Sequence, residues 1–119
     1  MRARIAAFFA VLLFAGHAAA ADLKDGSFTC TLGSMILGQI ELEAGMFRGP
    51  AFDGEFEGDY PFEVTASGTI NWGGPLGGLS SDGNTVVSTV LKKAGDRIGF
   101  DITIQNARGN VQTISCYPD

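Results

Sequence analysis

Residues 52–72, FDGEFEGDYPFEVTASGTINW, decide the fold of this chain. Every even-numbered residue from Phe52 to Trp72 is apolar or glycine, and every odd-numbered residue between them is polar or proline. A repeat of two is the spacing at which β-strand side chains alternate between two faces. The stretch is longer than an ordinary strand of roughly 3–10 residues, so we expect it to bend. The expected bends are at Gly54, Gly58, residues 59–61 and residues 67–68.

The same alternation recurs in four other stretches. The residues expected to face inward are Phe28, Cys30 and Leu32; Ile36, Gly38, Ile40 and Leu42; Ile98, Phe100, Ile102 and Ile104; and Ile114 and Cys116. Residues 85–91 are instead apolar on both faces, which is expected of a strand that is covered on both sides or lies at a seam.

Short turn signals separate these stretches, at Asp82-Gly83-Asn84, Ala94-Gly95-Asp96 and Arg108-Gly109-Asn110. No window after the first 21 residues shows apolar residues at helical spacing, and the 17 glycines disfavour long helices. We therefore predict an all-β protein, a small antiparallel barrel or rolled meander of seven to eight strands. A two-sheet sandwich is the alternative.

The N-terminus has the pattern of a signal peptide. Arg2 and Arg4 precede an apolar run, and a string of small residues follows it. We expect cleavage between Ala20 and Asp22, which leaves residues 22–119 as a single domain in the periplasm or outside the cell. The run is too short for a permanent transmembrane helix, and no later stretch approaches that length.

The two cysteines, Cys30 and Cys116, lie near the two ends of the exported part. In an oxidising compartment such a pair forms a disulfide, and here it would join the first and last strands. The chain-entropy account predicts a stabilisation of about 4–5 kcal/mol for a loop of this length. The domain is therefore expected to be closed by this bond.

The exported part is acidic. Six basic side chains face thirteen carboxylates after residue 21, a net charge of −7. No basic surface for nucleic acid or for an anionic membrane is therefore expected.

The catalytic repertoire is narrow. The single histidine, His17, is removed with the signal peptide, and the disulfide occupies both thiols. Ser-His-Asp and Cys-His mechanisms are therefore excluded, and zinc, haem and copper lose their commonest ligands. We expect no cofactor, no catalytic residues and no enzymatic activity.

Carboxylates are a class of potentially catalytic side chain that is plentiful in the exported part. Five of them share one face of the first stretch if it is extended: Asp53, Glu55, Glu57, Asp59 and Glu63. Their spacing, about 6–7 Å between successive members, suits an acid–base pair for glycoside hydrolysis. The competing interpretation is a solvated surface that protects a strand edge. An irregular calcium site is a weaker hypothesis for Asp53, Glu55, Glu57 and Asp59. Val64 stands where an EF-hand needs its last glutamate.

Two segments are candidate binding sites. The first is the glycine-rich segment after the only tryptophan, with candidate residues Trp72, Gly74, Pro75, Leu76 and Leu79. Alternatively, Trp72 and Leu76 plug one end of the core. The second is Phe47 beside Arg48: Phe47 falls on the outward parity, unless the alternation resets at Gly45 and buries it.

Three short motifs carry a resemblance: Gly26-x-Phe28-x-Cys30, then Gly68-x-Ile70-x-Trp72-x-Gly74-Pro75-Leu76, then a cysteine near the end. They resemble small exported bacterial proteins of uncharacterised function. The resemblance implies a bacterial source and implies no activity.

Our leading hypothesis is a non-enzymatic binding or interaction module of the bacterial periplasm or exterior. Its partner would be an unknown protein or a small apolar ligand. The alternatives are a carboxylate-based hydrolase of envelope glycans and a structural component of the envelope.

Overall fold

The computed structural model describes residues 23–49 and 59–119. The expected signal peptide and the first bends of the stretch 52–72 lie outside these residues. The described chain forms eight strands and one short 3-10 helix. They are β1 (Gly26–Leu32), β2 (Met35–Glu43), β3 (Met46–Arg48), β4 (Tyr60–Val64), β5 (Ile70–Trp72), η2 (Gly77–Ser80), β6 (Thr85–Ala94), β7 (Arg97–Gln105) and β8 (Val111–Pro118).

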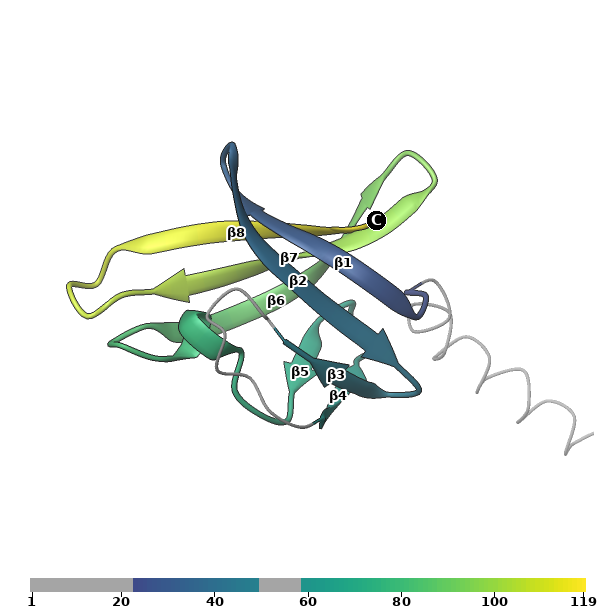
Figure 1. Cartoon of the computed structure of the whole chain (residues 1–119), viewed down its shortest axis with the longest axis horizontal. Helices are drawn as coiled ribbons and strands as arrows, with labels where there is room; N and C mark the ends of the chain where they lie inside the picture. The colour runs from purple at the N-terminus through teal and green to yellow at the C-terminus, as the bar shows by residue number, and fades with distance from the viewer. Residues whose placement is uncertain (1–22, 50–58) are drawn as a thin grey trace, which may run out of the picture.

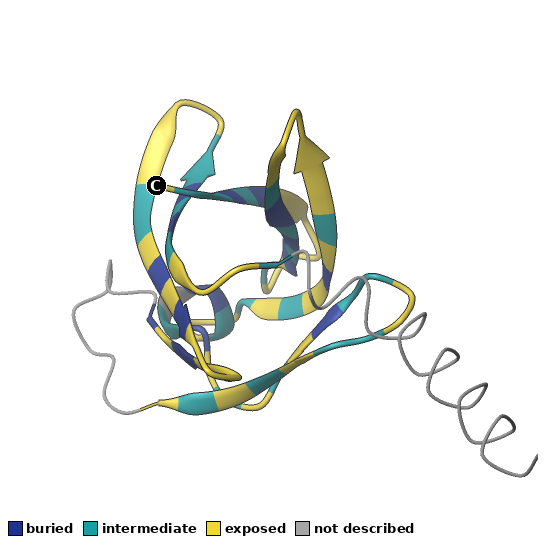
Figure 2. Cartoon of the chain, turned by 90° about the vertical axis from the view of Figure 1, so that its right-hand side faces the viewer, coloured by how far each residue is buried: buried dark blue, intermediate teal, exposed yellow. Residues whose placement is uncertain are grey.

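All eight strands belong to one antiparallel sheet with the order β5-β4-β3-β2-β1-β8-β7-β6. The sheet rolls into a nearly closed barrel, in which the first strand pairs with the last (Figure 1). Seen from the side, the strands curve around a common interior, and buried segments alternate with exposed ones (Figure 2). The prediction of a small antiparallel barrel is therefore confirmed, and the two-sheet sandwich is excluded.

The interior is filled by side chains from most of the strands. The fully buried large side chains include Phe28, Ile40, Leu42, Phe47, Leu76, Phe100, Ile102 and Ile114. Aromatic rings form its centre: the ring of Trp72 lies 4.9 Å from that of Phe47 and 5.6 Å from that of Phe100. Phe28 packs on Phe100 at 5.3 Å. The alternation of residues 98–104 is confirmed, because Phe100, Ile102 and Ile104 are all buried.

The disulfide lies at the pairing of the first and last strands. Cys30 is directly opposite Cys116 in the β1–β8 register, and both side chains are fully buried. The last residue is held as well. Asp119 donates its backbone N–H to Ser27, and its carboxylate accepts hydrogen bonds from Gln39 and Thr29. The expected covalent closure is confirmed, and polar contacts extend it to the end of the chain.

One inward expectation is wrong. Ile36 is 71% exposed, whereas Ile40 and Leu42 on the same strand are buried. The cause is a β-bulge. The β1–β2 register pairs Cys30 with Gly38 but Thr31 with Ile36, so Leu37 is the extra residue. A bulge inverts the parity of the residues beyond it, and Leu37 packs partly buried against the core in place of Ile36.

The structure describes no helix that is long and apolar enough to cross a membrane. Within residues 23–49 and 59–119 the single helical element is η2, which spans four residues.

The disulfide supports a direct stability prediction. A Cys30→Ala/Cys116→Ala variant should lose about 4–5 kcal/mol of unfolding free energy, because the bond closes a loop of 86 residues. Urea denaturation monitored by Trp72 emission measures this loss. Wild-type protein under reducing conditions is the control, and it should denature at a similar midpoint. Equal stability of the oxidised and reduced wild type would contradict the prediction.

Candidate functional site

The barrel has a seam between β5 and β6, the two edges of the sheet. In the described residues, the link between these edges consists of a few contacts at one end. Thr69 and Val90 form an isolated bridge, and Leu91 donates its N–H to the carbonyl of Gly68 at 2.8 Å. A side chain makes the next connection: the indole Nε1 of Trp72 donates to Thr89 Oγ1 at 2.7 Å.

Beyond these contacts the two edges bound a groove of about 440 Å³. We call it the seam groove. It is lined by Thr69, Ile70, Asn71, Trp72, Gly74, Leu76, Ser80, Val86, Val87, Ser88 and Thr89. None of these residues is charged. This uncharged lining contrasts with the chain as a whole, in which acidic residues outnumber basic ones.

Several side-chain polar groups of the seam groove are already hydrogen-bonded within the protein. Thr89 accepts from Trp72, and Ser80 Oγ both accepts from the backbone N–H of Leu76 and donates to a carbonyl. The hydroxyl of Thr69 is paired with that of Thr65. Asn71 and Ser88 lie exposed at the rim. The groove therefore offers apolar surface and strand edges, with little side-chain polarity at its floor.

A bulge on β6 shapes one wall of the seam groove. The β6–β7 register pairs Val86 with Ile104 and Ser88 with Thr103, so Val87 is the extra residue. Val87 is consequently 55% exposed, while Thr89 is buried. The sequence pattern of residues 85–91 predicts a strand that is covered on both sides or lies at a seam, and the structure has the second arrangement, because β6 is one edge of the sheet.

The predicted residues of the glycine-rich segment divide between the groove and the core. Trp72, Gly74 and Leu76 line the seam groove. Leu79 is buried in the core and is not among the lining residues, and Pro75 is exposed. Leu76 is buried as well, and Trp72 packs half-buried against the core, which agrees with the alternative interpretation of these two side chains as part of the core.

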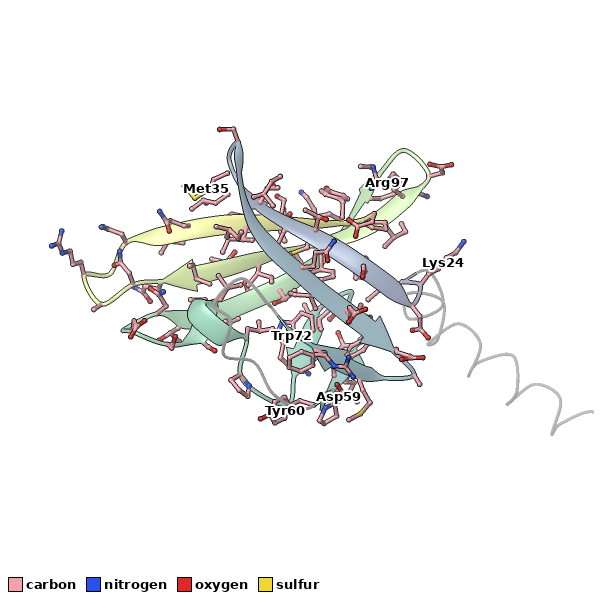
Figure 3. The ribbon with its side chains drawn as sticks, in the orientation of Figure 1. Lys24, Met35, Asp59, Tyr60, Trp72 and Arg97 are labelled. Atoms are coloured by element: carbon pink, nitrogen blue, oxygen red, sulfur yellow. A yellow bond between two sulfur atoms is a disulfide. The ribbon has the colours of Figure 1, made fainter. Side chains whose placement is uncertain are left out.

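Glycine is required where this segment passes over β4. A Cβ at Gly74 would clash with the ring of Tyr60, and a Cβ at Gly73 would lie 2.7 Å from the carbonyl oxygen of Pro61. Gly73 uses the close approach to donate its N–H to that carbonyl. Figure 3 shows Trp72 near the middle of the molecule and Tyr60 at its lower rim.

The proposed exposed anchor at Phe47 is wrong. Phe47 is only 1% exposed and packs on Trp72, while its neighbour Arg48 is exposed. The alternation resets in the turn before β3, where Ala44 and Gly45 both have positive φ angles, 53° and 80°. After this turn Phe47 pairs with Leu42, whose side chain also faces inward.

Arg48 contributes to a second cleft, of about 550 Å³, whose lining includes five charged residues: Asp25, Glu41, Glu43, Arg48 and Asp59. Its guanidinium makes two hydrogen bonds to Asp59, at 2.8 and 3.3 Å, and lies 3.8 Å from Glu41. The hydrogen bond from Arg48, supported by its positive charge, lowers the pKa of Asp59. A general acid needs a raised pKa, so Asp59 does not fit that role.

Only some of the other candidate carboxylates lie within the described residues. Asp53, Glu55 and Glu57 lie outside the described residues, and Glu63 is exposed on β4. For the calcium hypothesis this leaves Asp59, which Arg48 engages. Among residues 23–49 and 59–119, no three histidine, cysteine or carboxylate side chains are grouped closely enough to hold a metal ion.

Comparisons of the chain with protein-family models, with curated proteins and with solved structures found no match.

The main residues that the sequence interpretation missed are Val86, Val87, Ser88 and Thr89, one wall of the seam groove. The available signal was the two-sided apolar pattern of residues 85–91. That pattern indicated a seam, but it did not show which strand lies on the other side.

The bond across the seam can be tested by Thr89→Val, which keeps the side-chain shape and removes the acceptor. The indole N–H of Trp72 is then left without its partner at a half-buried position, which should cost about 1–3 kcal/mol of unfolding free energy. Urea denaturation measures the change. Thr113→Val, on the exposed face of β8, is the matched control and should change stability little. Equal effects of the two variants would show that the bond contributes nothing specific.

The ion pair between Arg48 and Asp59 leads to a prediction about pH dependence. Because the pKa of Asp59 is lowered in the folded protein, the pair stabilises the fold above the ordinary pKa of aspartate, and the stabilisation is lost as the pH falls through the lowered value. Arg48→Gln should return the pKa of Asp59 toward its usual range, as followed by NMR titration of the carboxyl. Arg108→Gln, in the distant β7–β8 turn, should leave it unchanged. A pKa of Asp59 that is the same in wild type and Arg48→Gln refutes the assignment.

Proposed function

We propose that this protein is an exported, non-enzymatic binding module and that it binds its ligand in the seam groove. The observation that carries the proposal is the uncharged groove between the two edges of an otherwise continuous sheet. Its size falls within the range of ligand pockets, about 300–1,000 Å³. A half-buried tryptophan on one wall and valines on the other supply apolar contact area.

The chemistry of the groove favours a neutral ligand. A charged group placed there would lose its hydration without meeting an opposite charge, which is costly. The hydroxyls of Thr89, which is buried, and of Ser80, which is half-buried, are already hydrogen-bonded within the protein. An uncharged ligand that carries apolar groups is therefore the best complement.

The sequence supports a site of action outside the cytoplasm. The N-terminal pattern of residues 1–21 supports export, and the resemblance to small exported bacterial proteins supports a bacterial periplasm or exterior as the location. A disulfide that is buried in the barrel is consistent with an oxidising compartment.

The two alternatives receive less support. A glycan hydrolase would need a desolvated carboxyl with a raised pKa, and at Asp59 the ion pair to Arg48 lowers the pKa. A purely structural envelope component would make no use of an open groove.

The test uses N-phenyl-1-naphthylamine, an uncharged apolar fluorescent probe, and the only tryptophan of the chain as the energy donor. Wild-type protein should bind the probe and transfer energy from Trp72, which lines the groove. Val87→Asp places a carboxylate on the groove wall and should weaken binding by roughly tenfold or more.

Val111→Asp is the matched control, because Val111 is a strand valine of similar exposure, 59% against 55%. It should bind the probe like the wild type. Circular dichroism checks that both variants fold. Absence of energy transfer in the wild type, or equal affinity of the two variants, would sink the proposed function.

A further inference from the structure

The two edges of the sheet differ from every other strand in one respect. β1, β2, β3, β4, β7 and β8 each have two neighbours in the sheet, whereas β5 and β6 each have one. A strand with one neighbour directs about half of its backbone N–H and C=O groups away from that neighbour. In the described residues, ladder pairing between β5 and β6 is limited to the bridge of Thr69 and Val90 and the adjoining Leu91–Gly68 bond. Residues 86–88 of β6 therefore line the seam groove without a described strand beside them, and the neighbouring element on that side is η2, whose Ser80 lines the same groove.

The two halves of the β6 edge carry different side chains. Beyond the bridge lie Lys92 and Lys93, both exposed. Lysines on an edge strand are a common device against pairing with another chain. Residues 85–88 are Thr-Val-Val-Ser, without a charge and rich in β-branched residues, which favour strand pairing. The lysine guard is therefore absent from the half of the edge that borders the groove, where the bulge at Val87 is the one irregularity of the described edge.

We propose that the seam groove accepts an extended, uncharged polypeptide segment of a partner protein, which adds as a strand beside residues 85–88 of β6. This inference rests on the proposed function, because it names the ligand class of the same groove. The backbone of such a segment meets the backbone groups of the edge, and its alternate side chains meet the apolar lining formed by Trp72, Leu76 and Val86. The absence of charge in the lining selects a segment without charged residues.

A backbone ligand fits the groove better than a compact apolar molecule does. The side-chain hydroxyls at the floor are already paired, so the polar groups left to a ligand are those of the strand edges and the rim residues Asn71 and Ser88. A compact apolar molecule would cover the edge groups without replacing their hydrogen bonds to water, which is costly. An extended backbone supplies donors and acceptors along its length, which meet the edge groups on either side of the bulge at Val87.

The experiment selects binders from a phage-displayed library of random octapeptides on the full exported domain. The selected peptides should be free of charged residues, with apolar side chains at alternate positions, and should displace N-phenyl-1-naphthylamine. Synthetic copies with blocked ends are then N-methylated at one or the other set of alternate amides. Methylating the set that faces the edge should weaken binding by about tenfold or more, and methylating the other set should have little effect.

Two variants of the protein localise the binding. Ser88→Lys extends the lysine guard to the groove half of β6 and should abolish peptide binding. Thr113→Lys places the same charge on an exposed position of β8, which has a neighbour on each side, and should leave binding intact. Circular dichroism and urea denaturation confirm that both variants are folded.

The outcomes separate the two proposals. If the fluorescent probe binds but no peptide is enriched, or if both sets of N-methylated peptides bind equally, strand addition is refuted while the groove remains a binding site. If neither the probe nor any peptide binds, both proposals fail. If sedimentation shows self-association that Val87→Asp abolishes, the occupant is a second copy of the chain, and a separate partner is refuted.

Discussion

The pairing of β1 with β8 is the interaction on which the architecture depends. A sheet that rolls around a core must have two edges unless it closes completely, and in a simple meander those edges are the first and last strands. Here the first and last strands are joined by a ladder from Phe28–Pro118 to Thr31–Ser115 and by a disulfide within it. The edges are therefore displaced to the middle of the sequence, to β5 and β6, and the groove between them is a consequence of how the ends are joined.

The core and the candidate site share one side chain. The ring of Trp72 packs against Phe47 and Phe100 in the interior, and its indole N–H crosses the seam to Thr89. Aromatic pairs of this kind contribute about 0.5–1.5 kcal/mol each beyond the area they bury. The wall of the seam groove is therefore fixed by the same contacts that stabilise the barrel, and a ligand would meet a surface that is already ordered.

The sequence predicted the strands and the closure well, because burial of one face imposes a repeat of two that is visible residue by residue. Phe28, Phe100 and Ile114 are buried as expected, and the two cysteines meet. It failed where the backbone changes parity. Ile36 is turned outward by a bulge, and Phe47 is turned inward after a turn in which Ala44 adopts a positive φ. The bulge leaves no mark in the polar–apolar pattern, whereas the second event was one of two alternatives, because Gly45 indicated a reset of the alternation that would bury Phe47.

Only one wall of the candidate site could be predicted from the sequence, for a related reason. The composition of the glycine-rich segment after Trp72 indicated a binding site, but its two leucines, Leu76 and Leu79, are buried in the core. The opposite wall, on β6, came from a segment whose apolar character on both faces indicated a seam. Which strand would face it depends on contacts between residues far apart in the chain, such as Trp72 with Thr89, and local pattern does not contain that information.

The antiparallel pairing of the terminal strands also determines how the domain would respond to mechanical load. Because Phe28 lies opposite Pro118, a force that pulls the two ends apart acts at the same end of the ladder and opens it one pair at a time, as a zipper opens. The opening stops at the Cys30–Cys116 bond. Tension would therefore peel away the short segments outside the two cysteines, including the residues of β1 that pair with β2, and once they are detached the covalent bond would bear the load in place of the strands enclosed between the cysteines.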